Sequence, residues 1–319
     1  MGLQISESFI EIIVGAFCCD TPARSFIKNI KGHNAYSGCD FCSTPGELIQ
    51  GRMTFCYLKG PLRTNDQFRE RTDEDHHKGY SPLEELPIDL INDFPTDYMH
   101  SVCLGVVRKM LFLWRDQGRG FGIRNQNIST ININIQNLSK FWPVDFNRKP
   151  QSLQNLENWK ATEFRHFLLY VGPVVLKREI PDYMFGNFMI LSFAMNMILN
   201  KELNAVYNEY ADYLLKLFVK HSIRIYGKTF CIYNVHSLIH LAPIAKKFDS
   251  LDLVNCFAFE NFLGILKRML RKPNLPLEQV VRRMKELRSY SCSNQVTKNH
   301  LSGPISIVVA RQLLNITSL

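Results

Sequence analysis

The sequence has no continuous apolar segment that clearly suits a membrane span, and its N-terminus carries no convincing secretory signal. The apolar stretch near the start contains Glu7 and Glu11, which a signal peptide would exclude. The most apolar internal run, residues 183–199, is at the lower length limit for a bilayer span and is interrupted by Asn187 and Asn196. We therefore expect a buried helix there, and no membrane among the partners.

A regular disulfide framework is also absent, because the nine cysteines are odd in number and irregularly spaced. This favours a reducing compartment in which some thiols are buried and others bind metal. The sequons at Asn127, Asn137 and Asn315 are then accidental. Gly2 and Ser6 fit the myristoylation pattern without a polybasic patch after them, and its use stays open.

Internal repeats, low-complexity tracts and obvious linkers are missing as well. With 319 residues, 46% hydrophobic and 12% aromatic, the chain is long and apolar enough to bury a sizeable core in one or two domains. The net charge of +9 and a pI near 9.1 admit an acidic partner such as nucleic acid without identifying one.

The N-terminal part predicts a small α/β piece. Residues 8–20, rich in Ile, Val and Phe, indicate a strand that ends at Asp20, and a helix with Thr21 as N-cap and Pro22 in its first turn follows. An acid between a strand and a helix is where open α/β sheets place active sites. A second strand is expected at residues 52–58.

The remainder predicts helices, because apolar residues recur at helical spacing from about residue 85 to 245 and again near the C-terminus. The stretch 125–139 is ambiguous between strand and helix. The strongest helical patterns lie at 97–114, 159–171, 202–222, 259–270 and 277–290.

Two pairs of residues have the types and spacing of zinc ligands. Cys39-x-x-Cys42 is a knuckle spacing, and His236 and His240 would lie on one face of a helix. A redox pair, or unrelated thiols and core histidines, are the alternatives. A metalloprotease helix is excluded because Ser237 stands where its glutamate should be. Together the four would complete a Cys2His2 site joining distant segments.

Acidic and basic residues suggest two further sites. Asp20 and Glu260 are candidate carboxylates, although Glu260 could simply be a helix-start glutamate favoured by the dipole. The C-terminal basic residues suit a phosphate backbone, although a solvated helix face is the commoner meaning of a charge run. These basic residues are Lys267, Arg268, Arg271, Lys272, Arg282, Arg283, Lys285 and Arg288.

Three stretches resemble one protein family. "FCCDTPARSFIKNIKGHNAYSGCDFC", "DYMHSVCLGVVRKMLFLW" and "NVHSLIHLAPIAKKFDSLDLVNCFAFENFLGILKRMLRKPNLPLEQVVRR" are similar to DDE transposases of the CACTA/EnSpm-like (CMC) group, nearest to the transposase domain-containing proteins of animal genomes. The resemblance covers about residues 14 to 290, and the motifs agree in order and spacing.

The resemblance implies a partial RNase H-like core, with a short sheet, split by a large all-helical insertion: a mostly helical α/β class. It implies core residues 1–80, an insertion over 81–245 and C-terminal core helices over 246–319. Asp20 and Glu260 would be the second and third catalytic acids and would bind magnesium or manganese. Cys39, Cys42, His236 and His240 would bind structural zinc.

The family's first catalytic Asp belongs upstream of Asp20, and residues 1–19 contain no aspartate. We therefore expect a truncated or domesticated, catalytically impaired DDE-core protein, intracellular and preferably nuclear. Its expected partners are DNA and a second copy of itself, with no small-molecule substrate. The alternatives are an active transposase or nuclease with a longer N-terminus, and a non-enzymatic interaction protein.

Overall fold

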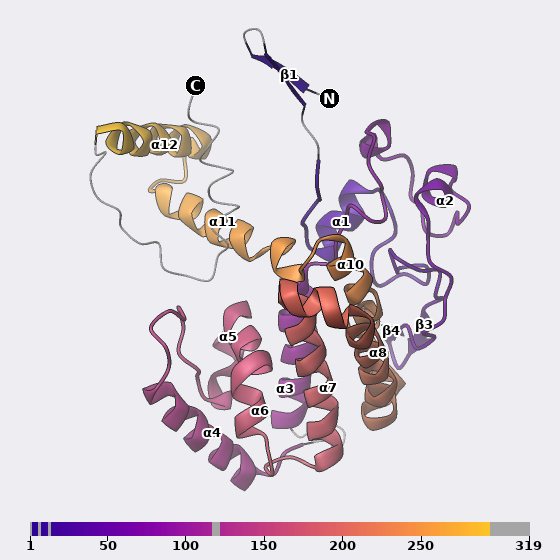
Figure 1. Cartoon of the computed structure of the whole chain (residues 1–319), viewed down its shortest axis with the longest axis vertical. Coiled ribbons are helices and arrows are strands. Elements are labelled where there is room, and N and C mark those ends of the chain that lie inside the picture. The colour runs from indigo at the N-terminus through magenta and orange to yellow at the C-terminus, as the bar shows by residue number, and fades with distance from the viewer. Residues whose placement is uncertain (1, 6–7, 12–13, 117–121, 294–319) are drawn as a thin grey trace. The chain divides into compact units, whose positions relative to one another are not determined.

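The computed structural model describes residues 2–5, 8–11, 14–116 and 122–293 of the chain (Figure 1). The chain forms two compact units, and each is described by itself. The first comprises Met1–Trp142 and Arg148–Asn255, and the second comprises Pro143–Asn147 and the chain from Cys256 on. The predicted domain boundaries at residues 80 and 245 stay predictions.

The first unit is mostly helical in its described part, as the spacing of apolar residues predicted. The ambiguous stretch 125–139 is a helix, and residues 183–199 form one as well. The elements are β1 Gly2–Ile5, β2 Ser8–Glu11, α1 Thr21–Ile27, β3 Glu47–Ile49, β4 Arg52–Thr54, α2 Asn65–Glu70, the 3-10 turn η1 Pro82–Glu85, the π-helix η2 Met99–Val107, α3 Arg108–Arg115, α4 Asn125–Lys140, η4 Leu153–Asn158, α5 Ala161–His166, the π-helix η5 Phe167–Val171, α6 Gly172–Val175, α7 Asp182–Leu199, α8 Lys201–Tyr226, η6 Lys228–Phe230, α9 Tyr233–His236, the 3-10 turn η7 Ser237–His240, α10 Leu241–Lys247 and η8 Leu251–Leu253.

Local chemistry explains where the longest helix begins and ends. Helix α8 starts after Asn200, whose side-chain oxygen accepts a hydrogen bond from the Leu203 N–H at 2.8 Å. It ends at Gly227, where φ is +81°, a conformation that favours glycine. The sequence therefore encodes both ends of α8 locally.

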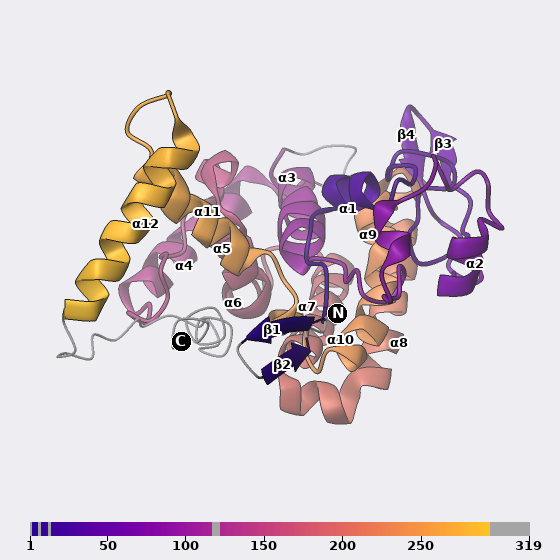
Figure 2. The same cartoon turned by 90° about the horizontal axis from the view of Figure 1, so that it is seen from above.

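The core of this unit lies where α3, η5, α7 and α8 meet (Figures 1 and 2). The Phe188 ring lies 6.1 Å from that of Trp114 and 6.0 Å from that of Phe167. Asn187, which interrupts the apolar run, is buried and donates to the Ser222 hydroxyl at 2.8 Å. This hydrogen bond offsets part of the cost of placing an amide in a packed core.

The strands differ from the prediction. The described strands form two antiparallel hairpins, β1 with β2 and β3 with β4, so the expected strand over residues 8–20 is wrong from residue 14 on. From residue 14 to Asp20, the chain runs irregularly and contributes only a parallel bridge of Cys19 with Thr96. The N-cap of α1 is Asp20, not Thr21 as predicted, because the Asp20 carboxylate accepts from the Ala23 N–H.

From Cys256 on, the described residues of the second unit form two helices joined by a short basic turn. Helix α11 spans Phe257–Met269 and contains no buried residue, and α12 spans Pro276–Ser293. The Gln279 side chain fixes the turn by accepting from the Arg271 N–H at 2.9 Å and donating to the Asn274 carbonyl at 2.6 Å. The predicted mostly helical α/β class is thus confirmed at that level.

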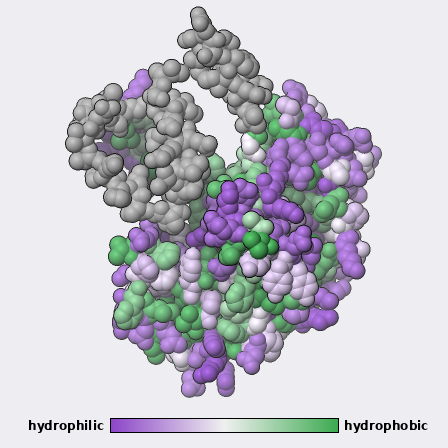
Figure 3. Space-filling view, viewed as in Figure 1, coloured by the Kyte–Doolittle hydropathy of each residue, from purple (hydrophilic) through white to green (hydrophobic). Residues whose placement is uncertain are grey.

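None of the described helices is both long and apolar enough to cross a membrane, α7 included. The space-filling view agrees, because hydrophilic residues are interspersed among hydrophobic ones over the coloured part of the visible face (Figure 3).

Candidate metal centre

Two cysteines and two histidines from distant segments converge inside the first unit. Cys39 and Cys42 lie in the irregular segment between α1 and β3, whereas His236 ends α9 and His240 ends the following turn η7. One ligand atom from each lies within 4.8 Å of all the others, and all four residues are buried. The predicted convergence is confirmed, although the histidines sit on a short α-helix that continues as a 3-10 turn.

The separations match a tetrahedral zinc site. The two Sγ atoms are 3.5 Å apart, Cys42 Sγ lies 3.3 Å from His236 Nε2, and Cys39 Sγ lies 3.6 Å from His240 Nε2. With Zn–S about 2.3 Å and Zn–N about 2.0–2.1 Å, tetrahedral geometry places two sulfurs about 3.8 Å apart and a sulfur and a nitrogen about 3.6 Å apart. The cluster could therefore hold a metal ion of this kind with little movement.

The histidine orientations suit ligation. His236 Nδ1 lies 3.1 Å from the Phe55 carbonyl, so that it donates there and leaves Nε2 free to face the sulfurs. The His240 ring stacks on Phe41, with 5.3 Å between the ring centroids. Burial lowers the pKa of His240, which favours the neutral imidazole that a metal needs.

The thiols have opposite electrostatic environments. Burial raises the pKa of Cys39 well above its ordinary value. The pKa of Cys42 is lowered, first by its hydrogen bond with Cys39 and, against the effect of burial, by its hydrogen bonds with His236 and His240. A metal ion would replace the protons of both thiols, so metal affinity should fall as the pH falls.

A buried guanidinium anchors the cysteine loop. Arg24, in α1, pairs through Nε with Asp40, which lies between the two cysteines, and both side chains are almost completely buried. Arg24 Nη2 also donates to the Tyr233 hydroxyl at 2.7 Å, and Nη1 donates to the Pro95 carbonyl at 3.2 Å. Burial alone would raise the pKa of Asp40, but the charges of Arg24 and Lys28 hold it below its ordinary value.

The two predicted carboxylates belong to different units. Asp20 is partly buried and caps α1, its Oδ1 lying 2.8 Å from the Ala23 N. Glu260 lies in the first turn of α11, where the helix dipole favours a negative charge. That they meet at one cleft stays a prediction.

Asp97 and His100 were missed from the sequence. The isolated parallel bridge of Cys19 with Thr96 pairs the residues that directly precede Asp20 and Asp97. Asp97 is buried and contacts His100 Nδ1 through Oδ2 at 2.6 Å. Asp-x-x-His spacing at the start of the predicted helix 97–114 was the available signal. Asp97 also caps that helix, since Oδ2 accepts from the His100 N–H at 3.0 Å.

The predicted basic residues lie in one unit. They occupy the last turn of α11, the turn after it, and α12. Of these, Arg282 and Arg283 contact Glu286 at 3.3 and 2.8 Å. Exposed pairs of this kind contribute little stability and rearrange readily, so both cations remain available to a phosphate. The side chain of Arg288 lies outside the described residues.

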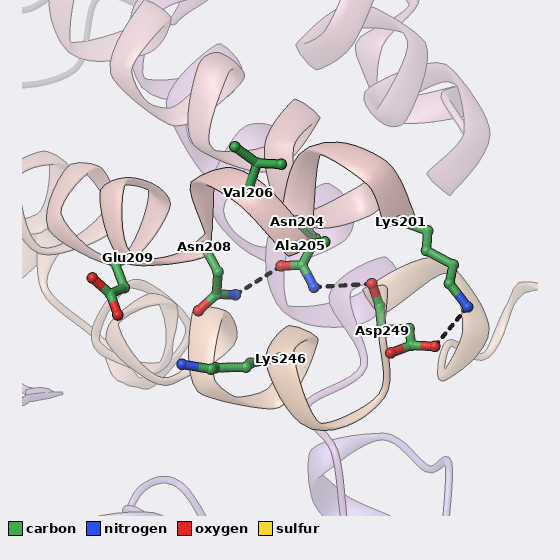
Figure 4. A pocket seen from close by; sticks show the side chains of 8 residues that line it. All are labelled: Lys201, Asn204, Ala205, Val206, Asn208, Glu209, Lys246 and Asp249. Carbon is green, nitrogen blue, oxygen red and sulfur yellow. Dashed lines mark hydrogen bonds and ion pairs between the residues drawn. The ribbon is translucent and has the colours of Figure 1, made fainter.

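A surface pocket along α8 and α10 has a structural explanation. Its lining includes Asn204 and Asn208. Asn208 donates to the Asn204 side-chain oxygen and to the Ala242 carbonyl, and Asn204 donates to the Ala245 and Asp249 carbonyls, while Lys201 pairs with Asp249 at 2.7 Å (Figure 4). These contacts fasten α8 to α10, and the pocket brings together no cluster of metal ligands.

No protein-family model, curated protein or solved structure matches this chain. Function must therefore be argued from the residues and their geometry.

We expect the purified chain to bind one zinc ion. Chelation should lower the Tm by about 10 °C or more, because a structural site contributes its binding free energy to folding. Cys42→Ala should abolish binding, whereas Cys103→Ala, at a buried thiol outside the cluster, should retain it. Zinc content by elemental analysis and thermal unfolding check both. Equal zinc content in the two variants would contradict the site.

Arg24→Met should destabilise the fold by about 3–5 kcal/mol, because it leaves the Asp40 carboxylate buried without its cation. Arg115→Met is the matched control, since Arg115 pairs with the exposed Glu157, and should cost about 1 kcal/mol or less. Urea unfolding of the zinc-loaded proteins measures both. Similar losses in the two variants would refute a special role for Arg24.

Proposed function

We propose that this chain is a transposase-derived DDE-core protein in which a structural zinc ion fixes the segments that carry its acids. One observation carries the proposal: the Cys2His2 cluster joins two segments, and each lies about the same number of residues along the sequence from one of the two acids. Cys39 follows Asp20 by about twenty residues, and His240 precedes Glu260 by about twenty. Zinc with four protein ligands serves structure and not catalysis, which suits a clamp between such segments.

The residues around Asp20 support this proposal. Arg24 lies one helical turn after Asp20 and contacts Asp40 and Tyr233, so the zinc cluster and the acid-bearing turn share one buried support. Asp97 follows the Cys19–Thr96 bridge as Asp20 does, and we include it as a second carboxylate of the proposed site. Carboxylate oxygens are the ligands of magnesium and manganese, which in two-metal sites stabilise the attacking and leaving oxygens of phosphoryl transfer.

The finer architecture is part of the same proposal. The cysteine-bearing segment and α1 would belong to an RNase H-like core, and residues 81–245, which end in the histidine-bearing segment, would form its helical insertion. Glu260 on α11 would be a further acid of the family's pattern, whose first aspartate has no counterpart in residues 1–19. The basic turn and α12 would contact the DNA backbone.

A second candidate function, that of a non-enzymatic DNA- or protein-binding remnant, is favoured by one observation. Both Asp20 and Asp97 cap helices through hydrogen bonds to backbone N–H groups. Carboxylates retained for capping alone need not bind a catalytic metal. The two functions share the zinc centre and differ in whether Asp20 and Asp97 bind a divalent metal ion.

We expect the 319-residue chain to bind duplex DNA with an affinity that falls steeply with salt. Replacing Arg271, Lys272, Arg282 and Arg283 with glutamine should weaken binding at least tenfold and reduce the slope of log affinity against log salt by about 3–4, about 0.9 per phosphate contact. Fluorescence anisotropy with a labelled duplex measures both quantities.

The matched control removes four exposed cations of the first unit, by changing Lys177, Lys220, Arg224 and Lys246 to glutamine. This variant should keep most of the affinity. Equal weakening in both variants would show that binding is not located on α11 and α12. A parent chain without measurable binding would remove DNA from the proposal.

The 319-residue chain should not nick supercoiled plasmid with Mg²⁺ or Mn²⁺. Three acidic residues normally hold the two metal ions of such a site. A displacement of the reacting groups by about 1 Å already lowers the rate on the order of a hundredfold. The control is the Asp20→Ala, Glu260→Ala double variant, which should behave like the parent. Metal-dependent nicking that is lost in the double variant and in Asp97→Asn would contradict this, and would identify Asp97 as the replacement for the first acid.

A further inference from the structure

Two thiols outside the metal centre meet where its segments are joined. The Phe55 N–H, just after β4, donates to the Cys231 carbonyl at 2.8 Å. Cys56 and Cys231 therefore lie on neighbouring segments of the chain. Both thiols are free. They are far apart in sequence, and the proposed function assigns no role to either.

The side chains of the two residues face each other. Cys231 Sγ donates to the Phe55 carbonyl at 3.2 Å, and Cys56 Sγ lies 3.6 Å from the Lys228 carbonyl. Each sulfur therefore contacts the backbone of the segment that carries the other cysteine. Cys231 is fully buried, whereas Cys56 is partly exposed. A small reagent can therefore reach Cys56 first, with Cys231 directly behind it.

The pKa values of the two thiols differ as well, and the more exposed thiol has the lower pKa. The neighbouring Cys231 thiol lowers the pKa of Cys56 to about 7, opposed by burial and the Glu47 charge and assisted by the Thr54 hydroxyl and the Lys228 charge. The Cys56 thiol and burial raise the pKa of Cys231. An accessible thiolate beside a buried thiol is the arrangement of an attacking and a resolving cysteine.

We propose that Cys56 and Cys231 form a reversible disulfide when the chain meets a peroxide. The Cys56 thiolate attacks one peroxide oxygen, the O–O bond breaks, and the leaving oxygen takes a proton to become water. The resulting Cys56 sulfenic acid is attacked by the Cys231 sulfur, the S–O bond breaks, and the Cys231 proton leaves with the hydroxide as a second water. Two thiols are oxidised and one peroxide is reduced.

The disulfide would join the same two segments as the metal centre. The Phe55 carbonyl receives hydrogen bonds from both His236 Nδ1 and Cys231 Sγ. Oxidation removes the Cys231 donor and leaves the His236 contact in place, so the metal centre should persist. The bond would then keep β4 attached to α9 even after a chelator has removed the metal.

The test exposes the zinc-loaded chain to a small molar excess of hydrogen peroxide, blocks remaining thiols with N-ethylmaleimide, and maps peptides without reduction. We expect one peptide containing Cys56 linked to one containing Cys231, with zinc retained, and the link should disappear with dithiothreitol. Cys56→Ser and Cys231→Ala should abolish the link, whereas Cys103→Ser should keep it. Iodoacetamide should label Cys56 at a rate that rises through about pH 7.

Two results would overturn the proposal. One is oxidation that links Cys39 to Cys42 and releases zinc while Cys56 and Cys231 stay reduced. The other is a parent chain in which Cys56 stops at the sulfenic acid, as it should in Cys231→Ala. Peptide mapping of the parent decides both, so the conclusion does not depend on whether a variant folds.

Discussion

The buried guanidinium of Arg24 is the contact on which the arrangement of the first unit depends. A charge removed from water must be matched by partners held in fixed positions. Arg24 has such partners on three other segments: Asp40 in the cysteine loop, Pro95 two residues before Asp97, and Tyr233 in α9. Its planar fork of donors allows little variation in their directions. Helix α1, and with it Asp20, is therefore held against both halves of the metal centre.

The cysteine loop needs these side-chain contacts because its backbone forms few hydrogen bonds of regular secondary structure. Between α1 and β3 the chain contains no helix or strand, only single bridges at Ile30 and Cys42. Such a loop has many conformations to lose on ordering. The Cys39–Cys42 knuckle and the Arg24–Asp40 pair restrict the loop at neighbouring residues. The thiols of Cys56 and Cys231 lie close by, because Cys231 Sγ and His236 Nδ1 contact the same Phe55 carbonyl. The Arg24–Asp40 pair, the four candidate metal ligands and these two thiols thus lie in one region of the first unit.

The capping roles of Asp20 and Asp97 and a metal-binding role are compatible. A carboxylate has two oxygens with about four lone-pair sites, and Asp20 uses Oδ1 for its cap. Capping also fixes the orientation of the carboxylate before any metal arrives, which lowers the cost of ordering it. Capping contacts alone therefore do not separate an inherited catalytic acid from a purely structural one. Binding of magnesium or manganese at these carboxylates does.

Local spacing by itself determined the helices at 183–199 and 202–222, the ligand types at the metal centre, and the pairing of each cysteine or histidine with its near neighbour. These follow from periodicity and side-chain chemistry within a few turns. The strand expected up to Asp20 was wrong, because a short apolar run fits several structures equally well. Only the tertiary structure brought His236 to Cys42, Thr96 to Cys19 and Tyr233 to Arg24. Contacts between residues so distant in sequence depend on how the whole unit packs, and no local pattern of residues encodes that.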